Sequence, residues 1–310
     1  MAVAIVGFRN PDDIVRCLKA LERSTHQDFE VVVCENGGQA SFDALAAILP
    51  STLEKGQKVS LIKSEKNGGY AGGVNICIKA TPSADAWWVL NPDTEPMPAS
   101  LERMVSRLGE GDVDAVGNTL LAENGSVQSH GGTWQRWLAR AVSIGSGEGA
   151  GHGPSRRIIE KRQNYLNGAS MLIGRRFRDR AGLMREDYFL YCEEIEWCIR
   201  AARHGLRLGF AEDAPVLHRK GTTTGFGRKT ANPSGFRSDF SLYLSHRNAV
   251  LLTRDCFPYC LAVAAPSALF LTLLRCRRQY SWPQLRVAFM GWLAGLRGER
   301  GVPSWMSISS

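Results

Sequence analysis

The fold class is decided by the stretch Ala86-Trp-Trp-Val-Leu-Asn-Pro-Asp-Thr-Glu95. Its apolar run, residues 86–90, ends at Asn91-Pro92-Asp93, so a carboxylate stands just beyond a predicted buried strand. In open α/β sheets, ligands bind beyond the carboxyl ends of the strands. Asn91 and Asp93 are two residues apart and would share one face of an extended chain, where an amide and a carboxylate oxygen suit Mg²⁺ or Mn²⁺. Asn-Pro-Asp is also good turn chemistry, so these residues alone leave both interpretations open.

Predicted strands and helices alternate around this stretch. The strands are residues 2–8, 29–34, 58–63, 86–90 and 115–121, and the helices are a segment from Pro11, residues 42–49, a segment that ends at Ala80, and residues 98–108. Asn10 is expected to cap the first helix, with Pro11 at its first position. This alternation predicts an α/β protein with a doubly wound, mostly parallel central sheet flanked by helices.

The second half contains fewer regular patterns. A glycine- and arginine-rich region covers residues 131–162, and residues 145–153 within it are expected to form a mobile loop. Residues 165–173 predict a strand with a polar interruption at Asn167-Gly168. The next helix carries Glu193 and Glu194 at its N-terminus, where acids are also common without any function. Strands at residues 206–211 and 214–217 end at His218, before a basic segment at 219–228.

Composition narrows the class of partner and the compartment. The 310 residues carry a formal charge of +8, which favours anionic partners without choosing among them. Eight scattered cysteines form no Cys-x-x-Cys pair, a pattern that suits a reducing cytosol. The N-terminus shows no basic region and no cleavage site, so a cytoplasmic protein is expected. The arginines do not alternate with aromatic residues on one element, which argues against a nucleic-acid partner.

The last seventy residues change character. Residues 256–274 carry no charge, and Arg275, Arg277 and Arg278 follow them. With Pro266 inside, this run predicts two short amphipathic helices that pack on the domain or lie in the interface of an anionic membrane. Peripheral association with the inner face of the cell membrane is therefore one expectation, and a plain helical cap is the alternative.

Polar or glycine-rich loops follow the first three predicted strands at one sheet edge. Glu35 can accept hydrogen bonds from a ribose hydroxyl or a base N–H. The run Asn67-Gly-Gly-Tyr-Ala-Gly-Gly73 can bring backbone amides and a helix N-terminus close to a phosphate, although a purely structural turn fits it as well. The run matches neither the dinucleotide-binding Gly-x-Gly-x-x-Gly pattern after the first strand nor the P-loop, so both of these classes are disfavoured.

The order of the motifs is more specific than any one of them. The motifs are Ala4-Ile-Val-Gly-Phe-Arg-Asn10, Val31-Val-Val-Cys-Glu-Asn-Gly37, Asn67-Gly-Gly-Tyr-Ala-Gly-Gly73, Leu90-Asn-Pro-Asp93, Asn167-Gly-Ala-Ser-Met-Leu-Ile173, Asp187-Tyr-Phe-Leu-Tyr-Cys-Glu-Glu194 and His218. Together they resemble the inverting family 2 glycosyltransferases, most of all the rhamnosyltransferase-type enzymes of bacterial surface polysaccharide synthesis. The resemblance covers residues 2–255, and it is looser for the helical C-terminal extension at 256–310.

The resemblance implies a GT-A fold, with a nucleotide-binding half at about 1–121 and an acceptor half at about 122–255. It implies a dTDP-, UDP- or GDP-sugar donor, a saccharide or lipid-linked saccharide acceptor, and Mg²⁺ or Mn²⁺ held by Asp93 and His218. Glu194 stands where an Asp usually serves as catalytic base, and Glu193 is its rival. The donor contacts that it implies are Phe8, Arg9, Asn10, Glu35, Asn67, Gly68, Gly69, Gly72, Asn91 and Asp93. The acceptor contacts are Trp134, Asn167, Gly168 and Tyr191.

Two other functions stay open at this point. Asn91 and the two Glu residues at family Asp positions suit a non-catalytic glycan or nucleotide-sugar binder on the same fold. A sugar nucleotidyltransferase shares the parallel sheet and the metal carboxylates, although Gly7-Phe8-Arg9-Asn10 is a poor version of its glycine-rich signature.

Overall fold

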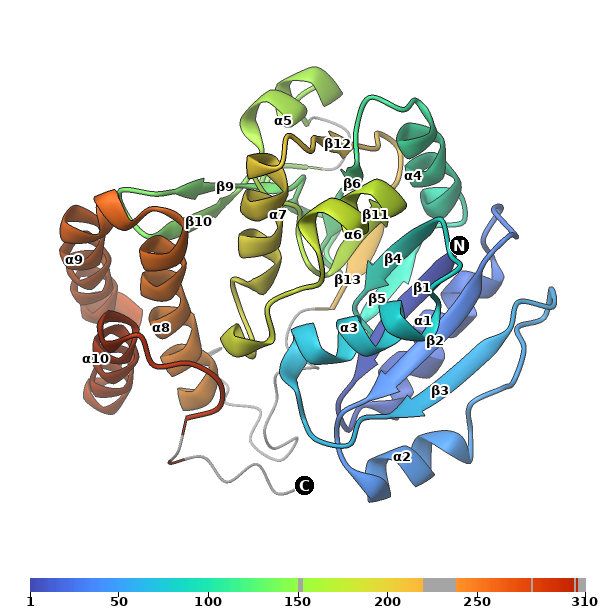
Figure 1. Cartoon of the computed structure of the whole chain (residues 1–310), viewed down its shortest axis with the longest axis horizontal. Coiled ribbons are helices and arrows are strands. Elements are labelled where there is room, and N and C mark those ends of the chain that lie inside the picture. Colours follow the sequence, from blue (N-terminus) through green and yellow to red (C-terminus); the bar gives the residue numbers. More distant parts are fainter. Residues whose placement is uncertain (150–152, 220–237, 280, 304, 306–310) are drawn as a thin grey trace.

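The computed structural model describes residues 1–149, 153–219, 238–279, 281–303 and 305 (Figure 1). Its central layer is a seven-stranded sheet in the order β12-β6-β11-β4-β1-β2-β3. These strands are β1 (Ala2–Gly7), β2 (Glu30–Glu35), β3 (Val59–Lys63), β4 (Ala86–Leu90), β6 (Ala115–Gly117), β11 (Ser170–Gly174) and β12 (Leu208–Phe210). β1 runs parallel to β2 and β4, whereas β11 runs antiparallel to β4 and β6. The predicted α/β class is confirmed, with β11 as the antiparallel member.

Helices cover both faces of this sheet (Figure 1). Side chains alternate along each strand, so Trp88 faces one helical layer and Trp87 the other. The first layer holds α1 (Pro11–Glu22), α2 (Gln39–Ala46) and α4 (Ser100–Gly109); the second holds α3 (Gly69–Ala80), α6 (Arg175–Ala181) and α7 (Glu193–Arg203). Both tryptophans are fully buried, and replacing such a side chain by alanine typically costs about 3–5 kcal/mol.

A second, smaller sheet crosses the carboxyl edge of the first. Its order is β5-β13-β7-β8, formed by β5 (Thr94–Pro96), β13 (Val216–His218), β7 (Leu120–Leu121) and β8 (Val127–Ser129). β13 pairs with β5 on one side and with β7 on the other. A hairpin of β9 (Gly132–Gln135) and β10 (Arg140–Ser143) precedes the short helix α5 (Arg156–Arg162). The small sheet thus brings strands from both halves of the domain to the end of β4.

Three helices form a separate layer beside the sheet (Figure 1). They are α8 (Asp239–Cys256), α9 (Leu261–Gln279) and α10 (Trp282–Arg297). The short turn η2 (Pro258–Cys260) lies between α8 and α9, and the short turn η1 (Glu186–Tyr188) lies earlier in the chain, before α7. α10 packs so closely on α8 that a Cβ at Gly291 would overlap the carbonyl oxygen of Tyr243. α8 is therefore covered by α10 and by the domain, and α9 and α10 form the outer surface of this layer.

Several local predictions were wrong. Residues 115–121 form two strands in different sheets, β6 and β7, because the chain turns between them and the Asn118 amide donates to the carbonyl of Ala214. The helix expected at 42–49 covers 39–46. The Asn10 side chain accepts from the N–H of Phe8 and makes no cap bond to α1. Instead of two short helices, residues 256–274 contain the end of α8, η2 and most of α9, with Pro266 inside α9.

Parts of two predicted segments lie outside the described residues. These are residues 150–152 of the expected mobile loop and residues 220–228 of the basic segment. No single helix in the described part of the chain is long and apolar enough to cross a bilayer. The bent pair 239–256 and 258–274, with an angle of 118° between its halves, passes the same test only on length and composition.

Candidate functional site

The end of β4 carries Asp93 to the carboxyl edge of the main sheet, where β13 arrives from much later in the chain. β5 pairs antiparallel with β13, so Thr94 lies opposite His218. The N–H of Arg219 donates to the carbonyl oxygen of Asp93 at 2.9 Å, which extends this pairing by one residue. As a result, Nε2 of His218 lies 3.4 Å from Oδ1 of Asp93, and both side chains are largely buried.

Gln128 on β8 fixes the orientation of the His218 ring. Its Nε2 donates to the carbonyl oxygen of His218 at 2.6 Å, and its Oε1 lies 3.0 Å from Nδ1 of the same residue. This bonding places a proton on Nδ1, so Nε2 is the ring nitrogen that faces Asp93. An imidazole nitrogen and a carboxylate oxygen are both common ligands of divalent metals. Among the described residues, no group of three or more His, Cys, Asp or Glu side chains could hold a metal ion.

Glu35 ends β2 on the same edge and is 1% exposed. Its Oε1 accepts from the N–H groups of Gly37, at 2.6 Å, and Arg9, at 3.2 Å. Its Oε2 is buried and has no hydrogen-bond partner among the described residues. An unsatisfied buried carboxylate oxygen is costly, and an N–H or O–H of a bound ligand would satisfy it. The Arg9 guanidinium lies over the Phe8 ring, 5.3 Å from its centroid. Phe8, Arg9 and Glu35, three of the predicted donor contacts, therefore lie together.

The glycine run at the start of α3 has a structural reason. Gly69 has a φ of +70°, and a Cβ there would overlap the carbonyl oxygen of Phe189. The N–H of Tyr70 donates to that carbonyl at 3.0 Å, and the N–H of Gly69 donates to Oδ1 of Asn67 at 2.9 Å. Two amides at this helix end are therefore engaged inside the protein. The donor contacts predicted for Asn67, Gly68, Gly69 and Gly72 stay predictions.

The turn at Asn167-Gly168 lies beside the end of β4. The N–H of Asn91 donates to the carbonyl oxygen of Ala169 at 2.9 Å, which is the last bond between β4 and the turn before β11. Oδ1 of Asn167 accepts from the N–H of Ala169 and closes the turn. The Tyr70 hydroxyl donates to the carbonyl of Gly168, and Glu194 lies beside the turn, where a Cβ at Gly168 would be in ordinary van der Waals contact with it. Predicted donor and acceptor residues thus meet at this edge.

Glu193 and Glu194 begin α7 but have different surroundings. Glu193 is buried, and its Oε2 has no hydrogen-bond partner among the described residues. Burial, and then the neighbouring Glu194 charge, raise the pKa of Glu193 well above its ordinary value. Glu194 is half-buried, and burial raises its pKa to about 7. A carboxyl group with a pKa near neutrality is suited to general-base work, whereas the burial of Glu193 favours its protonated form.

The segment before α7 has an unusual backbone. Phe189, Tyr191 and Cys192 have φ values of 67°, 76° and 72°. Side chains with a Cβ rarely adopt this region, and each such residue costs on the order of 1–3 kcal/mol. Residues of this kind persist only where the surrounding structure holds them, and they are frequent at functional sites.

The two remaining acceptor predictions, Trp134 and Tyr191, make contacts in other parts of the protein. Trp134, on β9, is 4% exposed and belongs to the apolar core. The Tyr191 hydroxyl lies 2.6 Å from the Ser241 hydroxyl on α8. Gln128 and Tyr70 lie at the site but were not singled out from the sequence. Gln128 stands in a segment without a motif, and only the pairing of β8, β7 and β13 brings it to His218.

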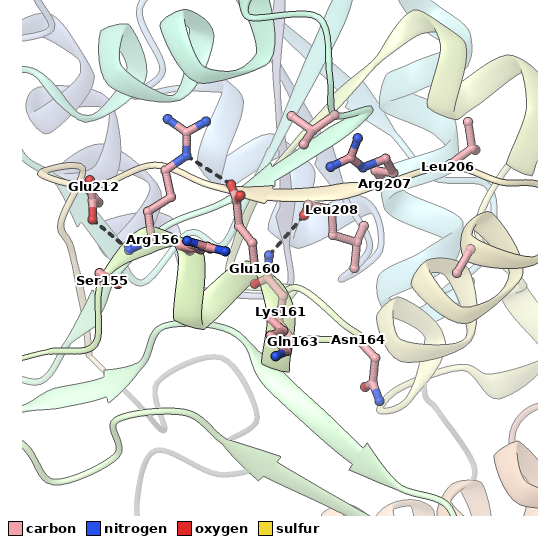
Figure 2. A pocket seen from close by; sticks show the side chains of 13 residues that line it. Ser155, Arg156, Glu160, Lys161, Gln163, Asn164, Leu206, Arg207, Leu208 and Glu212 are labelled. Atoms are coloured by element: carbon pink, nitrogen blue, oxygen red, sulfur yellow. Dashed lines mark hydrogen bonds and ion pairs between the residues drawn. The ribbon is translucent and has the colours of Figure 1, made fainter.

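A cavity of about 720 Å³ lies elsewhere, at the amino ends of β6 and β12 (Figure 2). In Figure 2 the Arg156 guanidinium bonds to Glu160 and its backbone N–H to Glu212, while Gln163 donates to the carbonyl of Leu208. β6 runs antiparallel to β11, which runs antiparallel to β4, so this cavity is at the edge opposite Asp93. None of the predicted site residues lines it.

Comparisons with known proteins identify the family and the fold of this chain. Residues 2–171, more than half of the chain, match glycosyl transferase family 2. The low-salt glycan biosynthesis hexosyltransferase Agl10 of Haloferax volcanii is 22% identical over 260 residues, or 83% of this chain and 76% of that protein. The N-acetylglucosaminyl-diphospho-decaprenol L-rhamnosyltransferase of Mycobacterium tuberculosis is 22% identical over 244 residues, or 73% of this chain and 78% of that protein.

Solved structures are similar at the level of the fold. S. aureus TarS 1-349 in complex with UDP-GlcNAc has a TM-score of 0.57 and 14% identity, over 95% of this chain and 80% of that one. Mannosyltransferase PcManGT from Pyrobaculum calidifontis, in complex with GDP-Man and Mn²⁺, has a TM-score of 0.53 and 14% identity, over 96% of this chain and 86% of that one. The fold is GT-A, and the chain belongs to glycosyl transferase family 2.

Proposed function

We propose that this enzyme moves a sugar, with rhamnose as the first candidate, from a nucleotide diphosphate sugar to a saccharide acceptor with inversion at the anomeric carbon. The observation that carries the proposal is the convergence of Asp93, His218, Glu35 and Glu194 on one sheet edge. Hexosyltransferase and rhamnosyltransferase relatives support the sugar class, and the name of the M. tuberculosis relative supports a saccharide linked to a lipid diphosphate as the acceptor. The process that we propose is cell-surface polysaccharide synthesis. The low identity of these relatives leaves dTDP-, UDP- and GDP-sugars as candidate donors.

The donor would lie along the carboxyl edge of β1, β2 and β4. The unsatisfied Oε2 of Glu35 suits a nucleoside N–H or O–H, and the Arg9 guanidinium over Phe8 adds positive charge beside it. Asp93 and His218 would hold Mg²⁺ or Mn²⁺ at the diphosphate, because a carboxylate oxygen and an imidazole nitrogen that lie 3.4 Å apart are both suitable metal ligands. Such a metal, when bound, neutralises charge that develops on the leaving diphosphate. Asn91, at the end of β4, contributes a neutral contact.

Glu194 acts as the general base. Its carboxylate accepts a proton from an acceptor hydroxyl, and the hydroxyl oxygen then attacks the anomeric carbon from the face opposite the leaving diphosphate. A single displacement of this kind inverts the anomeric centre. Burial and the neighbouring Glu194 charge raise the pKa of Glu193, which favours its protonated form and makes it the weaker candidate for the base. The acceptor would lie against Asn167, Gly168 and Tyr191, with Trp134 supporting this wall from the core.

The acceptor is a lipid-linked saccharide presented at an anionic membrane, and the enzyme works from the cytoplasmic side. The support is the outer face of α9 and α10. We use this term for seven exposed apolar residues, which are Val263, Phe270, Leu273, Leu274, Trp282, Phe289 and Met290. Trp282 is 84% exposed and Phe270 is 59% exposed, values that are unusual for such large apolar side chains.

Charge favours a bilayer as the partner of this face. Residues 256–274 carry no charge, Arg275, Arg277 and Arg278 follow directly, and Arg286 is exposed on α10. Apolar residues flanked by arginines and a tryptophan are typical of helices that lie at a lipid headgroup layer. A plain helical cap would instead present a polar outer surface.

Donor binding tests the proposal most directly. The wild-type protein would be titrated with dTDP-, UDP- and GDP-sugars, with and without Mn²⁺, and transfer to a lipid-linked saccharide would be followed by mass spectrometry. The expected result is metal-enhanced binding of one nucleotide class and transfer with inversion. Binding without any transfer would favour a non-catalytic binder, and release of pyrophosphate from a nucleoside triphosphate and a sugar phosphate would favour a nucleotidyltransferase.

A further inference from the structure

One side chain of α8 holds the segment that leads into α7. The amide nitrogen of Asn248 lies 2.8 Å from the carbonyl oxygens of Tyr188 and Leu190, and 2.9 Å from that of Tyr191. Asn248 is fully buried, and its Oδ1 accepts from Nε of Arg247 at 2.9 Å. A guanidinium only donates, so the amide oxygen must face Arg247 and the nitrogen must face the three carbonyls.

The neighbouring carbonyls are bonded as well. The carbonyl oxygen of Asp187 accepts from the N–H of Gly301 at 2.7 Å, and that of Phe189 accepts from the N–H of Tyr70 at 3.0 Å. Arg247 adds a second side-chain bond to the carbonyl of Tyr188, at 3.0 Å. Every carbonyl from residue 187 to residue 191 therefore lies within hydrogen-bond distance of a donor. The two N–H groups of Asn248 are shared among three of these carbonyls.

The backbone that Asn248 holds leads directly to the proposed base, Glu194. Phe189, Tyr191 and Cys192 are held at positive φ, and Glu193 and Glu194 follow without a break. Residues with a Cβ leave that region when nothing holds them. Loss of the Asn248 bonds would let the segment relax and would turn the first helical turn of α7, together with the Glu194 carboxylate.

We propose that Asn248 is a positioning residue for Glu194. It acts through the backbone of residues 188–191 and contacts neither the donor edge nor the carboxylate itself. The proposal rests on the proposed role of Glu194 as the base. It assigns to α8 a part in catalysis that goes beyond covering the domain.

Asn248→Asp is the first test, because it keeps the size of the side chain and the bond from Arg247 but cannot donate. Its second oxygen would also repel the three carbonyl oxygens. We expect kcat to fall about 10- to 100-fold, as misplacement of a catalytic group by about 1 Å can cost 10²-fold. The donor Kd should stay within twofold, and the acidic limb of the kcat–pH profile should move, because the surroundings of the carboxyl group change. Asn248→Ser, which keeps one donor, should lie between Asp and wild type and carries the test if the Asp variant does not fold.

Thr253→Val is the matched control. Thr253 is also fully buried on α8, but its hydroxyl donates only to the carbonyl of Ala249 in the same helix. The Thr253→Val variant should have a lower Tm and an unchanged kcat and pH profile. The inference is overturned if the Asn248 variants differ from wild type only in Tm, as this control does, while Glu194→Gln is inactive. A fully active Glu194→Gln would instead overturn the assignment of the base, and the positioning role with it.

Discussion

Nε2 of His218 lies 3.4 Å from Oδ1 of Asp93, in a pairing that no local sequence pattern contains. Asp93 follows a buried strand of the first half, and His218 ends a short strand of the second half. Their contact depends on antiparallel pairing of β5 with β13 in a separate sheet. The metal site proposed here is therefore a product of the small sheet, and it should be sensitive to changes in that sheet as well as to changes in its two ligands.

Asp93→Asn should nearly abolish transfer and leave the fold intact. The change removes the negative charge that would bind the cation, and charge stabilisation at a leaving diphosphate is worth several kcal/mol, so a loss of roughly a hundredfold or more is expected. Mn²⁺ binding, followed by electron paramagnetic resonance, should weaken in parallel. Asp114→Asn is the control, because Asp114 is equally buried but accepts from the N–H of Arg207 at the opposite edge. Activity of the Asp93 variant within a few-fold of wild type would contradict the metal assignment.

Gln128→Leu should weaken Mn²⁺ binding although Gln128 is not a ligand. Without the bond to Nδ1, the His218 ring can rotate and can place its proton on Nε2, which then cannot bind a metal. Loss of such an outer partner typically costs 10- to 100-fold in metal affinity or activity, so a Kd increase of about 10-fold or more is expected. Gln163→Leu is the matched control, since Gln163 is a buried glutamine that donates to the carbonyl of Gly209 far from the site. Equal Mn²⁺ affinity in both variants would show that Gln128 does not orient His218.

Whether a structural feature could be predicted from the sequence depends on how far apart in the chain its interacting residues lie. The strands around Trp87 and Trp88 and the positions of Asp93 and Glu194 follow from local apolar runs and helix starts, and these were predicted correctly. The small sheet was not predicted, because β5, β7, β8 and β13 are two to three residues long and have no period of their own. Asn248 acts through backbone carbonyls, which leave no trace in the side-chain pattern, and Gln128 reaches the His218 ring only through the pairing of strands that are far apart in the sequence. Such residues are visible only after the backbone has been placed.

Glu194→Gln should lower kcat by about 10²- to 10⁴-fold with nearly unchanged donor affinity. The amide keeps the size and hydrogen bonding of the carboxyl group but cannot take a proton, and this is the usual range for loss of a general base. Glu193→Gln is the matched variant, because it makes the same change one residue earlier in a fully buried position. We expect its kcat to stay within a few-fold of wild type, since a protonated carboxyl group and an amide are alike in charge. If the two phenotypes are exchanged, the base is Glu193.

The pKa of Glu194 also predicts two pH dependences. Since the base must be ionised, kcat should fall about tenfold per pH unit below about pH 7. Folding raises this pKa from 4.5, so the folded state binds the proton more tightly, and stability is lost as pH rises from about 4.5 to about 7. The penalty above pH 7 is at most about 3 kcal/mol. Glu194→Gln should therefore raise Tm at pH 8, by no more than about 10 °C, and by less at pH 5. Calorimetry that shows a lower Tm for this variant at pH 8 would contradict the raised pKa.

The last prediction concerns the outer face of α9 and α10. Deletion of the tail is a poor test, because α10 covers α8 and the Arg247 guanidinium donates to the carbonyl of Gly301, so a shortened chain would lose part of its core. Replacing Phe270, Leu273 and Phe289 by serine leaves these contacts in place. We expect the triple variant to lose co-sedimentation with anionic liposomes while its Tm and its activity on a soluble acceptor stay unchanged. Wild-type binding should weaken with added salt, because arginines contribute to it.

The matched control replaces Ile48, Met97 and Ile158 by serine, three apolar residues that are similarly exposed but scattered over other elements. This variant should bind liposomes like the wild type, since isolated apolar residues bury too little area to hold a protein at a bilayer. Sedimentation equilibrium separates the competing explanation. If the wild type is a dimer that dissociates in the Phe270–Leu273–Phe289 variant, and neither protein binds liposomes, the outer face is an interface between two copies of the chain. Binding to lipid by a monomeric wild type, lost only in the α9–α10 variant, supports presentation of a lipid-linked acceptor at this surface.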